Sequence, residues 1–432
     1  MNLLVTNTQA PQAYAIIRAL RPHARRLIAT VEGDGWRPRL SHGAHSRLVD
    51  ATHRVPAPVR DWQQGRVGRE NSPLEEQYLD AIIRICEREQ IDIIYPSWDP
   101  YVYVLSKNKT RLAELGVTVP VPDFDTVLTA LDKYRTVQAG QAVGFPCPAT
   151  YLYESPQQLA DVQDRLGFPL VLKPRFTSGG HGMAIVRDHT ELDAALPPIL
   201  ARHGRPMIQE YIPGGQRDSV QFVMGRDGAV LFAFHKSRQR TLRRMARFGT
   251  VSESASPEAR LLQSSALLQR VGWWGAMGIE TIRDPRDGRA KLMEINPRFP
   301  RQLWNRTELC INEPLMCIRL ARQEPVAPVE PYPIGVLFVS PIEDVQLMAL
   351  QLLDWLLYAV RTRIGRQPPL DPMSAPPGLR AQAWSFASTY AGRRRRVWDP
   401  YFRHFFQDPV TATLWWLQFS SWLAGSWRQL GR

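Results

Sequence analysis

Residues 294–298 of this chain read Glu-Ile-Asn-Pro-Arg. In a strand, side chains two residues apart lie on the same face, so Glu294, Asn296 and Arg298 would point to one side. Carboxylate and amide oxygens, together with nucleotide phosphates, are typical ligands of Mg²⁺. An arginine adds a forked donor for a phosphate or a carboxylate. The pentapeptide therefore predicts a short strand on which metal, phosphate and acidic substrate meet.

The composition bounds the size and charge of the protein. The chain has 432 residues and a formal charge of +13, from 54 basic and 41 acidic residues. This length predicts two to four domains with ample core. From Arg361 onward there are eleven Arg, no Lys, three Asp and no Glu, a net charge of +8. Most of the excess charge therefore lies at the C-terminus and says little about an active site.

The N-terminus and the cysteines indicate a cytoplasmic protein. No basic region and no long apolar stretch accompany Leu3–Thr6, so no secretory signal is predicted. The four cysteines form no Cys-x-x-Cys pair and no zinc-ligand spacing; they are Cys86, Cys147, Cys310 and Cys317. Buried thiols in a reducing compartment are the simplest interpretation.

Residues 1–115 have the pattern of a small α/β domain. Apolar runs at Leu3–Thr6, Leu27–Val31 and Ile91–Tyr95 predict strands, and helical spacing is present at Pro11–Leu20 and Pro73–Glu89. This alternation is typical of a doubly wound parallel sheet. No Gly-x-Gly-x-x-Gly follows the first strand, which argues against a dinucleotide site.

A glycine-rich turn lies between two predicted strands beyond the proline-rich segment Val119–Pro122. Asp125–Val143 is predicted to be one helix. Leu170–Lys173 is a predicted strand that runs into the turn at residues 175–182, and Met183–Val186 is the returning strand. The arrangement differs from a Walker P-loop, whose Gly-x-x-x-x-Gly-Lys pattern is absent. Glycine amides can nevertheless fold over phosphates.

Two hairpins are predicted in the following segment. Val220–Met224 and Ala229–His235 flank an Asp-Gly turn, which is a good hairpin signal. Gly278–Ile282 and Leu292–Ile295 repeat the arrangement. The second hairpin would place Glu280 on a strand adjacent to that of the opening pentapeptide.

The order of these elements resembles the ATP-grasp superfamily, particularly its carbamoyl-phosphate-synthetase-like branch of carboxylate–amine ligases. The resemblance covers about residues 1–325 and implies a two-lobed fold that clasps ATP. We therefore expect an α/β and α+β protein with an N-terminal doubly wound parallel-sheet domain at 1–115. A first ATP-grasp lobe would follow at 116–206, a second at 207–330, and a mostly helical C-terminal extension at 331–432. The motifs that carry the resemblance are Asp132-Lys133, Lys173-Pro174 with its glycine-rich turn, Gln209-Glu210-Tyr211-Ile212, Glu280 and residues 294–298.

The resemblance also implies which residues form the site. The expected nucleotide contacts are Lys133, Lys173, Gly179, Gly180, Gly182, Gln209, Glu210, Tyr211, Ile212 and, for the ribose, Asp218. The expected ligands of Mg²⁺ or Mn²⁺ are Glu280, Glu294 and Asn296, and the expected catalytic cations are Arg298 and Lys236, with Arg238, Arg240 or Arg243 as alternatives to Lys236. Each of three features also has a simpler interpretation. The glycines could form a plain hairpin turn, Asp218 could be a surface-loop aspartate, and the run around Lys236 could be a solvated basic loop.

The implied function is that of an ATP- and Mg²⁺-dependent ligase. It would activate a small-molecule carboxylate as an acyl phosphate and couple it to an amine. One alternative is a carbamoyl-phosphate-synthetase-like enzyme that forms an acyl phosphate from a small acid, although no glutaminase domain or second grasp repeat is present. Another is a non-catalytic ATP-binding protein that docks to a membrane complex.

The C-terminal region contains two segments that are apolar almost all round, Asp344–Thr362 and Thr413–Trp427. Polar residues interrupt both, so neither has the clean apolar length of a spanning helix. The proline-rich Pro368–Pro377 and the run Arg393–Arg396 lie between them. Two interpretations stay open: peripheral contact with an anionic membrane surface, or packing on the catalytic lobe or a second subunit. No nucleic-acid-binding motif accompanies the arginines, so nucleic acid is not an expected partner.

Overall fold

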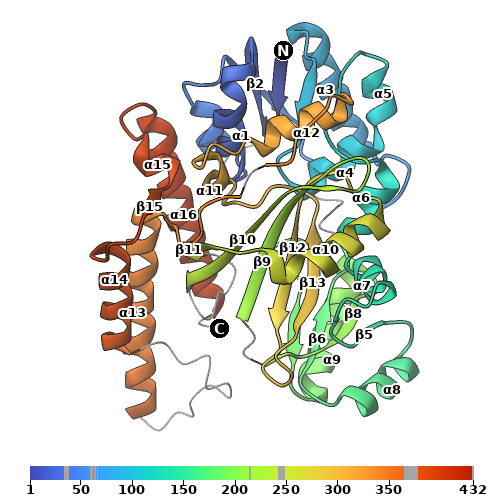
Figure 1. The fold of residues 1–432 in the computed structure, drawn as a ribbon. Coiled ribbons are helices and arrows are strands. Elements are labelled where there is room, and N and C mark those ends of the chain that lie inside the picture. Colours follow the sequence, from blue (N-terminus) through green and yellow to red (C-terminus); the bar gives the residue numbers. More distant parts are fainter. Residues whose placement is uncertain are drawn as a thin grey trace.

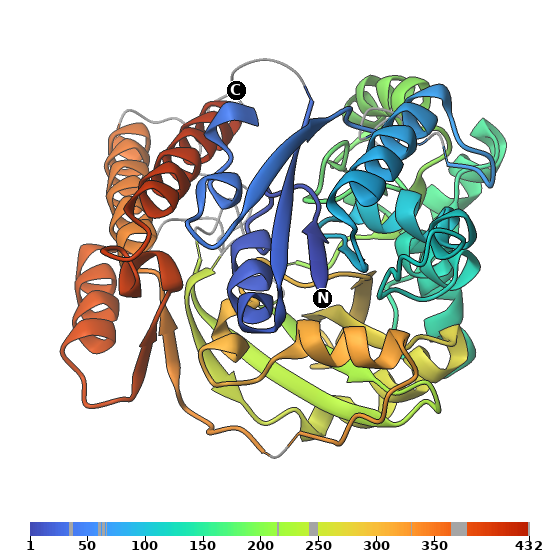
Figure 2. The same cartoon turned by 90° about the horizontal axis from the view of Figure 1, so that it is seen from above.

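The computed structural model describes residues 1–33, 38–58, 62, 65, 67–213, 216–241, 249–329, 331–363 and 378–430. Arg243 and the proline-rich segment 368–377 lie outside these residues, as do the side chains of Arg238 and Arg240. Figures 1 and 2 show the chain from two directions, with an N-terminal unit packed against a long central sheet and C-terminal helices along one side.

The N-terminal unit contains the predicted parallel sheet. Its strand order is β3-β2-β1-β4, and every pairing is parallel. Helix α3, which lies between β3 and β4 along the chain, begins at Pro73. Ser72 is its N-cap, and the side chains of Ser72 and Glu75 form a capping box. The elements are β1 (Asn2–Val5), α1 (Ala13–Leu20), β2 (Arg26–Glu32), β3 (Ala51–Val55), α3 (Pro73–Glu89), β4 (Ile93–Tyr95), α4 (Asp99–Lys107) and α5 (Lys109–Ala113), with 3-10 turns at Arg21–His23, Pro38–Leu40 and Gly43–His45.

A break at Asp132 makes the predicted helix Asp125–Val143 wrong as a single element. The structure has α6 (Phe124–Leu131) and α7 (Lys133–Ala142) instead. Asp132 is extended, and its carboxylate accepts hydrogen bonds from the backbone N–H of Tyr134 at 3.0 Å and of Arg135 at 3.5 Å. An N-cap of this kind satisfies the free donors of a new helix. The break puts Lys133 at the first position of α7.

A small antiparallel sheet of order β5-β8-β6-β7 follows. Leu170 and Leu172 of β6 are buried in its core with α8 and α9, so the alternating residues Val171 and Lys173 point to the opposite face. The elements are β5 (Thr150–Leu152), α8 (Pro156–Leu166), β6 (Leu170–Lys173), β7 (Ala184–Val186), α9 (His189–His203) and β8 (Met207–Glu210).

The central sheet has the order β13-β12-β9-β10-β11-β14-β15. The two predicted hairpins are confirmed as the antiparallel pairs β9–β10 and β12–β13. The sheet and the N-terminal unit share buried clusters: Leu4 lies in one with Phe222, and Leu3 in another with Phe234. The elements are β9 (Gln216–Met224), β10 (Val230–Thr241), β11 (Gly249–Ala255), α10 (Glu258–Val271), β12 (Gly275–Arg283), β13 (Ala290–Asn296), α11 (Trp304–Thr307), α12 (Glu313–Ala321), β14 (Leu337–Val339) and β15 (Arg396–Trp398).

The C-terminal region is joined to the rest of the fold through β14 and β15, which extend the central sheet. Its helices are α13 (Pro341–Arg363), α14 (Leu379–Tyr390), α15 (Pro400–Arg403) and α16 (Pro409–Leu430). Trp415 and Phe419 of α16 are buried in a cluster with Tyr14 of the N-terminal unit. Among the described residues, no helix combines the length and the apolar character needed to cross a membrane. The expected domain limits stay a prediction, and a limit at residue 330 would cut through this shared sheet.

Candidate functional site

A row of polar side chains crosses one face of the central sheet. The strand register sets Lys236 opposite Ser219, Ser219 opposite Glu280, and Glu280 opposite Glu294. Residues directly opposed in antiparallel strands lie on the same face. Lys236, Glu280 and Glu294 are therefore brought together on one face by four strands, β10, β9, β12 and β13.

The next row of the same face contains Asn296. Gly278 stands opposite both Asn296 and Gln221. A Cβ at Gly278 would come within 2.6 Å of the Gln221 side chain, so glycine leaves that side chain its space. The Asn296 Nδ2 donates to Glu294 Oε1 at 3.4 Å. These contacts place the amide beside the carboxylate, as period-two alternation predicted.

Glu280, Glu294 and Asn296 supply a hard oxygen donor set that suits Mg²⁺. In the described part of the chain there is no group of three or more His, Cys, Asp or Glu side chains that could hold a metal ion. The candidate set is two carboxylates and one amide, which leaves room for phosphate oxygens to complete a coordination shell.

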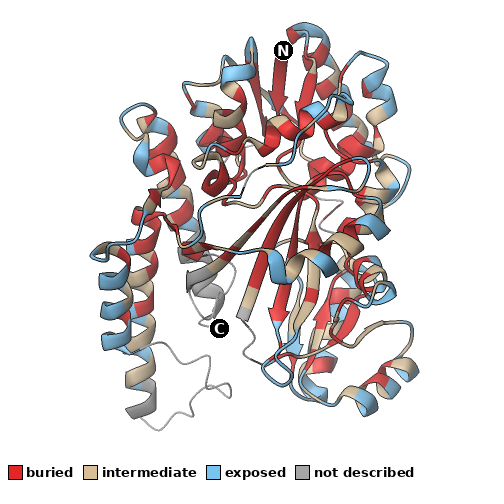
Figure 3. Cartoon of the chain, viewed as in Figure 1, coloured by how far each residue is buried: buried red, intermediate tan, exposed pale blue. Residues whose placement is uncertain are grey.

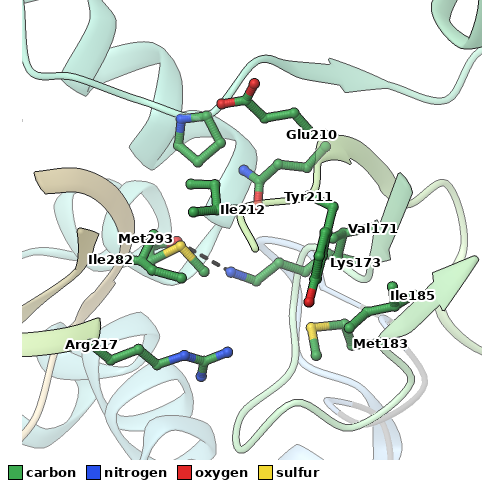
Figure 4. A pocket seen from close by; sticks show the side chains of 12 residues that line it. Val171, Lys173, Met183, Ile185, Glu210, Tyr211, Ile212, Arg217, Ile282 and Met293 are labelled. Atoms are coloured by element: carbon green, nitrogen blue, oxygen red, sulfur yellow. Dashed lines mark hydrogen bonds between the residues drawn. The ribbon is translucent and has the colours of Figure 1, made fainter. Parts of the chain in front are cut away.

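A β-bulge in β13 changes which side chains enter the cleft. Glu294 is opposite Glu280, but the next pairing joins Thr281 to Leu292, so Met293 is the extra residue. Met293 lines the cleft beside Lys173, and its carbonyl accepts a hydrogen bond from Lys173 Nζ at 3.2 Å (Figure 4). Simple alternation would have pointed Met293 away from the site, which is why sequence reasoning missed it.

Lys173 is buried beside the acidic row. Its Nζ lies 3.9 Å from Glu294 Oε2, and its residue is 6% exposed. Burial lowers the pKa of Lys173 to about 8; the nearby charges of Lys133 and Arg217 act in the same direction, and those of Glu294 and Glu280 oppose them. The ammonium is thus desolvated and available to an incoming anion.

Burial opposes ionisation of Glu294, but surrounding cations outweigh it. The charges of Lys173, Lys133, Arg298 and Arg217 together hold the pKa of Glu294 below its ordinary value. A half-buried carboxylate that is kept ionised is suited to bind a cation.

Lys133 reaches the glycine-rich turn from the first position of α7. Its Nζ donates to the carbonyl oxygens of Arg175, at 3.4 Å, and Thr177. Gly179, Gly180 and Gly182 have φ of +63°, +71° and +71°, in the left-handed region that favours glycine. The turn connects β6 to β7 as predicted and continues directly into Met183, which lines the cleft.

The cleft beside these charges has mainly apolar walls (Figure 4). Gln209, Glu210, Tyr211 and Ile212 line it, as expected for the adenine end. Sequence reasoning missed the remaining lining residues apart from Lys173; they are Pro148, Val171, Met183, Ile185, Arg217, Ile282 and Met293. Two of them could have been found from the sequence: Val171 lies two residues from Lys173, and Ile282 two residues from Glu280, so each pair shares one face of its strand.

The carboxylate of Glu210 serves the strand end rather than the cleft. It lies 2.6 Å from Lys291 Nζ and 3.5 Å from an Arg286 nitrogen. Both cations also contact Asp284. In Figure 4 the Glu210 carboxylate points away from Lys173. Any contribution of Glu210 to nucleotide binding therefore comes from its backbone.

Arg298 is held between the acidic row and the N-terminal unit. Its Nε lies 2.7 Å from Asp99 Oδ1, and one terminal nitrogen donates to Asn296 Oδ1 at 3.2 Å. Asp99, the first residue of α4, was not anticipated from the sequence because it is distant along the chain. Lys236 Nζ donates to Gln302 Oε1 at 2.5 Å, so the second expected cation also lies on this face.

Asp218 does not join the other expected residues. Ser219 faces the acidic row, so the adjacent Asp218 lies on the opposite side of β9. There its carboxylate accepts a hydrogen bond from Arg260 at 3.0 Å. The expected ribose contact stays a prediction, although strand parity turns the Asp218 side chain away from the acidic row.

Comparison with known proteins fits this geometry. Residues 130–301 match the ATP-grasp domain family, and residues 72–120 match the N-terminal domain of PylC-like proteins. The chain carries an ATP-grasp domain. Its matched segment contains the acidic row, Lys133, Lys173, the glycine-rich turn and Arg298.

The curated proteins that this chain resembles include large chains of carbamoyl phosphate synthase. It is 24% identical over 248 residues to the carbamoyl phosphate synthase large chain of Vibrio cholerae, which covers 53% of this chain and 22% of that protein. The chain thus spans about a fifth of that relative's length.

Solved structures share the fold of this ATP-grasp chain. The biotin carboxylase domain of 2-oxoglutarate carboxylase from Hydrogenobacter thermophilus has a TM-score of 0.57 at 18% identity, covering 75% of this chain and 70% of that one. N5-carboxyaminoimidazole ribonucleotide synthetase has a TM-score of 0.57 at 14% identity, covering 82% and 85%.

Proposed function

We propose that this protein is an ATP- and Mg²⁺-dependent ligase that activates a small-molecule carboxylate as an acyl phosphate and joins it to an amine. The observation that carries the proposal is the convergence of an apolar cleft, a buried lysine and an acidic row at one end of that cleft. The two solved relatives named above were determined with ADP, one of them also with Mg²⁺ and bicarbonate, which supports the same ligand class.

The cleft and its charges suit the two ends of ATP. Apolar side chains such as Val171 and Ile282 would cover the base, and the strand end at Gln209–Ile212 would border it. The ammonium of Lys173 would meet the phosphates, where a desolvated charge acts strongly on an anion. Gly179, Gly180 and Gly182 would let the turn approach the phosphates closely.

Bound Mg²⁺, held by Glu280, Glu294 and Asn296, would offset negative charge on the phosphate oxygens. The remaining residues would orient the reactants. Attack of a carboxylate on a phosphate brings two anions together, so Lys173 and Arg298 would offset the repulsion and favour an in-line geometry. Asn296 and Asp99 fix the direction of the Arg298 guanidinium, and Gln302 fixes Lys236.

The reaction then balances without a covalent enzyme intermediate. The carboxylate oxygen bonds to the γ-phosphorus of ATP, and ADP leaves. The amine attacks the acyl carbon, phosphate leaves with the electron pair of the broken C–O bond, and the amine proton passes to solvent or base. A turn that excludes water would limit hydrolysis of the acyl phosphate.

The proposal is tested by ADP release from the full chain with Mg²⁺ and pools of small acids, with and without amines. We expect release that depends on the acid, trapping of the acyl phosphate by hydroxylamine, and an amide detectable by mass spectrometry. Hydroxamate without any amide would favour the acyl-phosphate-forming alternative. ATP binding with no acid-dependent ADP release would contradict both and favour a non-catalytic nucleotide-binding protein.

A further inference from the structure

The long helix α13 has an exposed apolar face. Leu352 is 41% exposed, Leu356 47% and Val360 56%. These residues are four apart, so they form one stripe along the helix. A helix that faces water ordinarily carries polar residues in such a stripe.

The neighbouring helix α14 also exposes apolar side chains, and the side chains that it buries are polar. Its buried residues are the polar Gln382 and Thr389. Its exposed residues include Leu379, Trp384 and Phe386, with Trp384 76% exposed. The pair therefore buries polar side chains and exposes large apolar ones. A reversal of this size marks an interaction surface rather than ordinary variation.

The α13–α14 pair stands out from the rest of the molecule. Figure 1 shows α14 and the second half of α13 away from the central sheet, and Figure 2 shows them at the edge of the molecule from above. Figure 3 shows mostly exposed and intermediate residues along α14. The surface is thus accessible to a large partner.

Positive charge accompanies this surface. Arg380 is exposed at the start of α14, and Arg393 and Arg395 are exposed just beyond its end. The chain from Arg361 onward carries the net charge of +8. A symmetric second copy would bring the same positive segment toward itself, which is unfavourable. An anionic partner complements the charge.

We propose that the α13–α14 apolar surface, formed by Leu352, Leu356, Val360, Leu379, Trp384 and Phe386, docks on the surface of an anionic lipid bilayer. The apolar side chains enter the headgroup boundary, and the arginines contact acidic headgroups. Amphipathic helices with aromatic and basic residues bind in this interfacial position, without crossing the bilayer. The docking requires no ATP turnover.

The test is cosedimentation of the full chain with vesicles of equal parts phosphatidylcholine and phosphatidylserine, against vesicles of phosphatidylcholine alone. We expect binding to be about tenfold or more tighter with phosphatidylserine and to weaken as salt is raised. The double variant Trp384→Ala/Phe386→Ala should lose about tenfold in affinity. Leu262→Ala, an exposed apolar residue of α10 (82% exposed), is the matched control and should bind like the parent chain.

A second variant separates charge from apolar area. Arg393→Gln/Arg395→Gln should lose about thirtyfold on anionic vesicles and little on neutral ones, because about 1 kcal/mol per arginine, about 2 kcal/mol for both, corresponds to that change. Circular dichroism confirms that each variant is folded. Equal binding to both vesicles, or none, overturns the proposal. A dimer by light scattering without lipid that Trp384→Ala/Phe386→Ala dissociates also overturns it and assigns the surface to a second copy.

Discussion

The cleft face of the central sheet and the outer surface of α13 and α14 depart from ordinary globular packing in opposite directions. The cleft buries the charge of Lys173 and half-buries that of Glu294. The helices expose the apolar side chains of Leu356 and Trp384. Both arrangements lower the stability of the fold in water. Charges lose hydration when they are removed from water, and apolar groups that stay exposed forgo the gain from burial. Residues whose burial or exposure lowers the stability of the fold are therefore candidates for binding a ligand or partner.

The largest effect is expected for Glu294→Gln. Removing the charge that would hold the metal should lower turnover by about 10²- to 10³-fold, the range for loss of one electrostatic contact in an active site. Steady-state ADP release with the identified acid measures it. Asp218→Asn is the control, because that carboxylate lies on the opposite face and pairs with Arg260. Equal losses in both variants would contradict the assignment of the face.

A buried charge with a structural role should behave differently. Arg306 and Glu313 form an ion pair in which both side chains are at most 1% exposed. Arg306→Met leaves Glu313 unpaired, and burial already raises the pKa of Glu313. The free energy of unfolding should fall by about 3–5 kcal/mol, as measured by urea denaturation. Retained nucleotide affinity in the folded variant would distinguish this pair from the cleft.

Lys173→Met should show the reverse pattern. Loss of a charged hydrogen bond to phosphate lowers ATP affinity about 10- to 100-fold. The pKa of Lys173 lies near 8, below its ordinary value, so the charged form costs folding free energy and the thermal midpoint should not fall. Calorimetric titration and thermal melts measure the two quantities. A large loss of stability would make Lys173 a structural residue.

The same pKa predicts a pH dependence of binding. Lys173 is protonated below pH 8 and becomes neutral as the pH rises through that value. ATP affinity of the parent chain should therefore be flat near pH 7 and fall above pH 8, while Lys173→Met shows no such fall. A parallel decline in both proteins would assign the titration to another group.

The smallest effect is expected in the glycine-rich turn. Gly182 has φ +71°, and a Cβ there would come within 2.5 Å of His203 Nε2. Gly182→Ala should lower the free energy of unfolding by about 1–2 kcal/mol because an L side chain disfavours this conformation. Gly68→Ala, where a Cβ meets nothing within 4 Å, is the control. Chemical denaturation of both variants measures the difference.

Local pattern was sufficient for much of the fold and site. Strand alternation placed Glu294 with Asn296, and the Asp-Gly turn predicted the β9–β10 hairpin, because side-chain parity and turn chemistry are properties of neighbouring residues. Pattern failed at Asp132, where a side-chain cap ends one helix and begins another. The role of Asp218 stays a prediction, and strand parity places its side chain on the other side of β9 from the acidic row.

The sequence by itself determined the order of strands, turns and charged residues that the ATP-grasp domain requires. Only the tertiary structure decided that Asp99 meets Arg298, that a bulge admits Met293 to the cleft, and that Gln382 is buried while Trp384 is exposed. The physical reason is the distance along the chain over which each kind of interaction acts. Propensity and periodicity act over a few residues, whereas these three outcomes depend on segments that folding brings together from distant parts of the chain.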